Sequence, residues 1–111
     1  MAKRRNEENK RVKAILEMLK YKGIFAWRQN NMPVATRDGY RAFIGMPGLP
    51  DIIGVLPGGR FLGIEVKSDT GKQSDKQLDF QRALEIHGGV YILAYSVHDV
   101  ETKLSKLGGI K

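Results

Sequence analysis

The stretch LPDIIGVLPGGRFLGIEVKS, residues 49–68, decides the fold of this chain. Two apolar runs flank a Pro-Gly-Gly turn at 57–59, which is typical of a β-hairpin. Asp51 opens the first run, and Glu65 and Lys67 lie inside the second. Charged groups in a strand suited to burial cost several kcal/mol unless they have partners. These three side chains therefore need an explanation beyond the fold.

The length of the hairpin loop decides which way Asp51 points. A two-residue Gly-Gly loop would place Asp51 opposite Val66, on the wrong face of the sheet. A three-residue loop at 57–59 places it opposite Glu65, and the last glycine supplies the left-handed conformation that such loops need. A β-bulge at one of the glycines has the same effect. We expect one of these two arrangements, and because residues two apart share a face, either brings Asp51, Glu65 and Lys67 together.

Two neighbouring carboxylates and a lysine suit a metal-assisted reaction. The carboxylates repel each other, which raises the pKa of one of them unless a cation intervenes. A hard divalent cation such as Mg²⁺ accepts one or two carboxylates, a backbone carbonyl and several waters. Lys67 can orient a metal-bound water or stabilise a developing oxyanion, and Gly63 on the same face leaves room beside the carboxylates, so the set suits phosphodiester hydrolysis. The alternative is a structural ion pair of Lys67 with Asp51 or Glu65 on a solvent-facing sheet surface.

Before the hairpin, the sequence predicts a helix, a strand and a long loop. Apolar residues at helical spacing follow a basic tail at 1–6, and the helix is expected to stop at Gly23. Residues 24–30 resemble a short strand, in which we expect Trp27 to face the core. Residues 30–50 are rich in Gly, Pro and Asn and predict a long loop, which in a small domain is often functional.

After the hairpin, helical and extended patterns alternate. Helices are expected at 74–87 and 98–109, with an apolar strand between them at 90–96, in which Tyr91 is expected in the core. The order helix, strand, hairpin, helix, strand, helix predicts an α/β fold with a mixed sheet flanked by helices. The helix between hairpin and last strand is long enough for a parallel crossover.

Composition narrows the class of protein. With 111 residues, the chain suits one domain, and the lack of cysteine excludes disulfides and thiolate metal sites. No apolar run approaches the ~20 residues of a membrane span, and no signal peptide is evident, so we expect a cytoplasmic protein. The net charge is +7, and residues 1–41 hold all of this excess, with eleven Lys/Arg against four Asp/Glu. Such asymmetry favours a polyanionic partner, most often nucleic acid.

Several blocks of the sequence resemble a known family. Pro-Asp at 50–51 followed by Glu-Val-Lys at 65–67 is similar to the PD-(D/E)xK nuclease signature. The blocks GIFAWRQN, GMPGLPDIIGVLPGGRFLGIEVKS, SDKQLDFQRAL and GGVYILAYSVHDV, within residues 7–100, together resemble the stand-alone virus-type replication-repair nuclease (VRR-NUC) domain. The resemblance implies a restriction-endonuclease-like fold with a central hairpin. It also implies phosphodiesterase activity dependent on Mg²⁺ or Mn²⁺, and branched DNA, such as Holliday junctions or flaps, as substrate.

The resemblance further implies roles for individual residues. Asp51 and Glu65 match the family's metal-binding carboxylates, with the backbone carbonyl of Val66 as a further ligand, and Lys67 matches its catalytic lysine. Gln77 occupies the place of the glutamine that the family carries on the helix after the hairpin. Short phage-type members form homodimers that resemble Holliday-junction resolvases, which implies a dimer acting in DNA repair in a bacterial or phage-infected cell.

The family also places a glutamate on the first helix, pointing at the metal. Alignment of the first helix puts Glu8 there, and Glu8 lies four residues before Val12, so it follows the inward stripe. Glu7 lies about 100° around the helix and is the fallback. The segment after this glutamate, NKRV, departs from the apolar or glutamine-bearing residues expected there. Either glutamate could instead be a favourable charge in the first helical turn.

Basic and amide side chains near these elements are expected to hold the DNA backbone. Because no base-reading pattern is present, we expect recognition of shape and strongly salt-dependent binding. The alternatives are a non-catalytic basic nucleic-acid-binding module, a nuclease acting on RNA or plain linear DNA, and a nuclease subunit that needs a helicase or clamp partner. The candidate contacts are Arg4, Arg5, Lys10, Arg11, Arg28, Arg37, Arg41, Lys72, Lys76 and Gln81.

Overall fold

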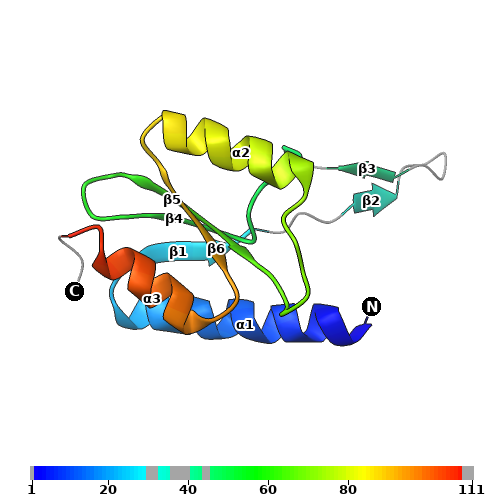
Figure 1. The fold of residues 1–111 in the computed structure, drawn as a ribbon, viewed down its shortest axis with the longest axis horizontal. Helices are drawn as coiled ribbons and strands as arrows, with labels where there is room; N and C mark the ends of the chain where they lie inside the picture. Colours follow the sequence, from blue (N-terminus) through cyan, green and yellow to red (C-terminus); the bar gives the residue numbers. More distant parts are fainter. Residues whose placement is uncertain (1, 30–32, 36–40, 44–45, 109–111) are drawn as a thin grey trace.

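The computed structural model describes residues 2–29, 33–35, 41–43 and 46–108, and shows a four-stranded mixed sheet between helices (Figure 1). The strand order is β1-β4-β5-β6, with β4 antiparallel to both β1 and β5 and β6 parallel to β5. This confirms the expected α/β class, and α2 makes the crossover between the parallel strands β5 and β6. No helix in the described residues is long and apolar enough to cross a membrane. The elements are α1 (Ala2–Tyr21), β1 (Phe25–Arg28), β2 (Pro33–Ala35), β3 (Arg41–Phe43), β4 (Ile52–Val55), β5 (Phe61–Val66), α2 (Asp75–Ile86), β6 (Val90–Ala94) and α3 (Val97–Ser105).

The hairpin has the three-residue loop that was one of the two predictions. Val55 pairs with Phe61, and the backbone N–H of Leu56 donates to the carbonyl of Arg60 at 2.8 Å. Residues 57–59 therefore form the loop, in which both glycines have positive φ, 92° and 89°. The same register, continued beyond β4, places Asp51 opposite Glu65.

Two expectations for the first third of the chain differ from the structure. The helix α1 begins at Ala2, so residues 2–6 are helical where the sequence predicts a tail. Within the predicted long loop, β2 and β3 pair into a second, two-stranded antiparallel sheet. The sequence did not indicate these three-residue strands, because an alternation of apolar and polar residues over only three positions carries almost no periodic signal. The end of α1 agrees with the prediction, because Gly23 adopts a φ of 75° just after it.

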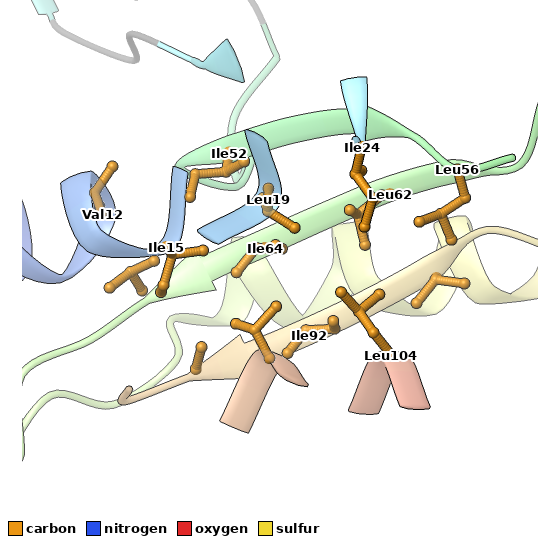
Figure 2. Close-up of a cluster of buried hydrophobic side chains, with 14 residues drawn as sticks. Val12, Ile15, Leu19, Ile24, Ile52, Leu56, Leu62, Ile64, Ile92 and Leu104 are labelled. Carbon is orange, nitrogen blue, oxygen red and sulfur yellow. The ribbon is translucent and has the colours of Figure 1, made fainter. Parts of the chain in front are cut away.

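One face of the sheet is sealed by α1 and α3 over an apolar core, shown in Figure 2. Leu62, Ile64 and Val66 of β5 point into this core, and α2 lies on the opposite side of the sheet (Figure 1). The core side chains from the helices are Val12, Ile15 and Leu19 of α1 and Val100 and Leu104 of α3.

The second face, toward α2, is less completely covered. Tyr91 is buried there as expected and its ring lies 6.5 Å from that of Phe80. Trp27, in contrast, is 40% exposed, so its expected place in the core was wrong. Its neighbours explain why: Ile24, just before β1, and Ala26 take the inward positions against the core, which leaves the alternate residues on the face toward α2.

Candidate active site

Asp51 and Glu65 meet at the end of the hairpin, on the face toward α2. Asp51 directly precedes β4, and its Oδ2 accepts a hydrogen bond from the backbone N–H of Val66 at 2.8 Å. Glu65 lies in β5 directly across from it. The aspartate carboxylate thus continues the ladder where β4 ends, and this backbone contact holds it in place.

Glu65 is a buried carboxylate with incomplete hydrogen bonding. It is 3% exposed, and its Oε2 accepts from Lys67 Nζ at 3.1 Å and from Gln77 Nε2 at 3.0 Å. Its Oε1 is buried without a hydrogen-bond partner. The ion pair with Lys67 considered from the sequence is therefore real, although it is buried and not on a solvent-facing surface. A buried oxygen without a donor costs free energy of folding, which indicates that a bound group completes this site.

The charge of Asp51 opposes the ionisation of Glu65. Burial, followed by the negative charge of Asp51, raises the pKa of Glu65 to about 8. Burial also raises the pKa of Asp51, while the Val66 N–H, a hydrogen bond with Glu65 and the charge of Lys67 lower it. Both shifts follow from placing two acids against one ammonium in a poorly solvated place.

Gln77 has two contacts that a single side chain seldom combines. It forms a capping box at the start of α2, where its Oε1 accepts from Ser74 N at 2.9 Å and Ser74 Oγ accepts from Gln77 N at 3.2 Å. Its amide Nε2 donates to Glu65. The start of α2 and the buried carboxylate are therefore held by the same residue.

The structure separates Glu8 from Glu7. Glu8 Oε2 accepts from the backbone N–H of Ser68 at 3.1 Å, one residue beyond Lys67, and its charge reaches Asp51. Glu7 lines a pocket with Lys3, Arg4 and residues 68–70. Of the two, Glu8 is the one that accepts from the backbone just after β5 and whose charge reaches Asp51.

A divalent cation fits the charge of this cluster. Asp51, Glu65 and Glu8 set three carboxyl groups against the one ammonium of Lys67, and the unpartnered Oε1 of Glu65 offers a ligand atom. A bound cation would displace the proton that Glu65 holds below about pH 8. Among the residues described, no three His, Cys, Asp or Glu side chains are grouped to hold a metal ion. Asp51 and Glu65 would therefore hold a cation as a pair of carboxylates, which suits Mg²⁺ because it keeps several of its waters. The room expected beside Gly63 is absent, because a Cβ there would lie 2.9 Å from Pro50 Cγ.

Several of the predicted DNA contacts have partners within the protein. Arg11 donates to the Lys67 carbonyl and to Asp69, both at 2.8 Å, and so ties α1 to the end of β5. Arg4 donates to Thr70 Oγ1, and Arg28 to Asn9 Oδ1.

The remaining predicted DNA contacts are Gln81, Arg41, Arg37 and four exposed basic side chains. Gln81 accepts from Gln73, which also donates to Tyr91, so it belongs to a polar network that the sequence did not indicate. Of Arg41, only the place at the start of β3 is described, and Arg37 lies outside the described residues. The exposed side chains of this set are Arg5, Lys10, Lys72 and Lys76.

Comparison with known proteins gives one informative match. No family model and no curated protein sequence matches the chain. A solved structure of a VRR_NUC domain superposes with a TM-score of 0.62 at 21% identity, over 89% of this chain and 95% of that one. This chain has the VRR_NUC fold. The resemblance seen in the sequence blocks is thus confirmed at the level of the fold, with the restriction-endonuclease-like arrangement that it implied.

Proposed function

We propose that this protein is a divalent-metal-dependent DNA endonuclease that hydrolyses phosphodiester bonds. The observation that carries the proposal is the buried Glu65, with one oxygen unpartnered, opposite Asp51 and beside Lys67. The VRR_NUC fold and the net charge of +7 support it, since the partner of such a site is a polyanion.

Each residue of the site has a part in this proposal. Asp51 and Glu65 hold the cation, Mg²⁺ or Mn²⁺, together with the carbonyl of Val66. A bound divalent cation polarises the phosphate and lowers the pKa of a water. Lys67 supplies positive charge where the departing or attacking oxygen becomes negative. Gln77 positions Glu65 through its amide, and Glu8 fixes the end of β5 through Ser68.

The test is a digestion panel of junctions, flaps, linear duplexes and RNA, run with Mg²⁺, with Mn²⁺ and with EDTA. We expect cleavage with either metal and none with EDTA. Asp51→Asn should abolish cleavage, because the amide keeps an acceptor for the Val66 N–H but loses the charge. Glu17→Gln, an exposed change on α1, is the matched control and should cleave normally. Metal-independent cleavage, or full activity in Asp51→Asn, would contradict the proposal.

The finer predictions concern the substrate and the assembly. We propose branched DNA as the substrate, and a homodimer in which two sites cut two strands symmetrically. Preferential cleavage of junctions or flaps over linear duplex, and a dimer mass in light scattering, would support them. The exposed basic residues lead us to expect binding that weakens steeply with salt. A cytoplasmic location stays a prediction.

A second candidate function is a non-catalytic DNA-binding module. It is favoured by the buried Glu65–Lys67 ion pair, which could be purely structural. Such a module would bind DNA with either metal and never cleave it. Cleavage that starts only after a helicase or clamp is added would instead indicate a nuclease subunit that needs a partner.

A further inference from the structure

The sheet face that carries the candidate active site continues into an apolar groove that α2 covers only in part. No residue of α2 is buried, although this helix lies over the sheet. A groove of about 700 Å³ runs between α2 and the β4–β5 hairpin, lined by residues that include Ile53, Phe61 and Phe80. Lys76, next to Gln77, lies at the rim of this groove.

Two exposed aromatic rings extend this surface onto the edge strand β1. Phe25 is 68% and Trp27 40% exposed, and their ring centroids lie 5.2 Å apart. Trp27 pairs with Ile53, so it shares the face of the groove, and Phe25 shares a row with Phe61 through Val55. Phe25, Trp27 and Phe61 therefore form one strip, named here the aromatic strip.

The aromatic strip lies next to the two carboxylates. The pairing places Asp51 and Glu65 in one row across the strands, Trp27 and Ile53 in the next row, and Phe25 in the row after that. Strand geometry sets these rows about 7 Å apart and neighbouring strands about 5 Å apart, so Trp27 lies roughly 8 Å from Asp51. That distance corresponds to about two stacked base steps of a DNA strand.

The place and the area of the strip decide what it binds. Trp27 lies in the row next to Asp51 and Glu65, so a nucleotide strand whose phosphate reaches these carboxylates passes beside its ring. The exposed part of the strip amounts to roughly 300 Å², well below the ~800 Å² that each partner buries in a stable dimer. Aromatic rings beside a site that holds the nucleic-acid backbone are the pattern by which proteins hold unpaired bases.

We propose that the aromatic strip stacks with unpaired DNA bases next to the bond that is cut. The proposal rests on the proposed nuclease function and narrows its substrate class to DNA with single-stranded nucleotides at the cleavage point, such as flaps, bulges or opened junctions. Stacking tolerates any base sequence, which agrees with recognition of shape and not of sequence.

Trp27 allows a direct test, because it is the only tryptophan in the chain. Oligothymidylate is titrated into the protein in EDTA, and Trp27 fluorescence is followed. The matched ligand is an abasic oligonucleotide of equal length and charge. We expect quenching by oligothymidylate, with an affinity about 10- to 100-fold higher than for the abasic chain. Equal binding of the two ligands, or binding without a change in Trp27 emission, would overturn the proposal.

Two variants sharpen the test. Phe25→Ala should weaken oligothymidylate binding about 5- to 50-fold and leave abasic binding unchanged. Tyr21→Ala is the control, because Tyr21 is 93% exposed at the end of α1, on the other side of the sheet. Phe25 is mostly exposed, so circular dichroism should show both variants folded. A loss of dimer mass in Phe25→Ala, with binding intact, would identify a second copy of the chain as the occupant and overturn the proposal.

The outcomes separate this proposal from the proposed nuclease function. If Phe25→Ala leaves cleavage of branched DNA unchanged on every substrate, the stacking proposal is overturned and the proposed nuclease function stands. If the protein shows base-dependent quenching but cleaves nothing with any metal, the stacking proposal stands and the nuclease function is overturned.

Discussion

The two faces of one six-residue strand, β5, differ in almost every physical respect. Leu62, Ile64 and Val66 are buried against α1 and α3 in a sealed apolar core. The alternate positions carry Phe61, Gly63 and Glu65, and Lys67 follows on the same face just beyond the strand, so this face has charges and a partly exposed ring. The core face therefore supplies the stability. The α2 face bears two unfavourable features, buried charge and exposed aromatic surface, and a bound ligand would relieve both.

Glu65→Gln should separate the two faces of β5 most strongly, because it changes cleavage much more than stability. We expect cleavage to fall by about 10³-fold or more, because the carboxylate is the proposed metal ligand. The melting temperature in EDTA should stay about equal near neutral pH, where Glu65 holds a proton, and rise above pH 8, where the variant removes a buried charge opposed by Asp51. Single-turnover cleavage and thermal melting measure the two effects. Cleavage within tenfold of the wild type would show that Glu65 serves only the fold.

Ile64→Ala makes the complementary change on the core face. Ile64 is fully buried, so its truncation should lower the free energy of unfolding by about 2–5 kcal/mol. Urea denaturation measures this loss. At a temperature where the variant is folded, cleavage should remain within a few-fold of normal, because no side chain of the site is removed. A thousandfold loss of cleavage in the folded variant would mean that the two faces are not separable.

The pH dependence of stability should come from the α2 face. The pKa of Glu65 is about 8 in the folded chain against 4.5 for a free side chain, so the folded state holds the extra proton between these values. The stabilisation is therefore complete below about pH 4.5 and is lost as the pH rises through 8, by roughly 2–4 kcal/mol. Urea denaturation in EDTA at pH 5.5 and 8.5 measures it.

Two controls test the origin of this dependence. Glu65→Gln should flatten the profile, because the titrating group is gone. Addition of Mg²⁺ at pH 8.5 should restore stability to the wild type and not to the variant. A profile that is the same in both proteins would place the titrating group elsewhere.

Gln77 has the smallest expected effect, and two variants divide its roles. Gln77→Ala loses both the capping box and the contact with Glu65, and should cost about 1 kcal/mol of unfolding free energy. Gln77→Glu keeps a capping-box acceptor but sets a carboxylate against Glu65. It should keep the helix capped, measured by circular dichroism, and lower cleavage more than Gln77→Ala does. Equal cleavage in the two variants would show that the amide does not serve the site.

The hairpin and the order of the elements of the main sheet and its helices could be predicted from the sequence, because alternation and turn residues are local signals, whereas β2 and β3 were missed. The register followed from the loop, so the pairing of Asp51 with Glu65 could be predicted as well. The exposure of Trp27 could not, because it depends on how much of the sheet α2 covers, a tertiary property with no local signal. The hydrogen bond from Ser68 to Glu8 joins residues 60 positions apart, and sequence spacing does not reveal such a contact.

The tie between α1 and the end of β5 has a consequence for how the chain is made. Glu8 and Arg11 hold Ser68 and Lys67 from the opposite end of the sequence, while Gln77 holds Glu65 from the far side. No fragment shorter than residues 8–77 contains all of these groups. A ribosome-bound chain therefore lacks the assembled cluster until α2 has emerged, and splitting the gene anywhere within this span leaves neither half with the complete cluster.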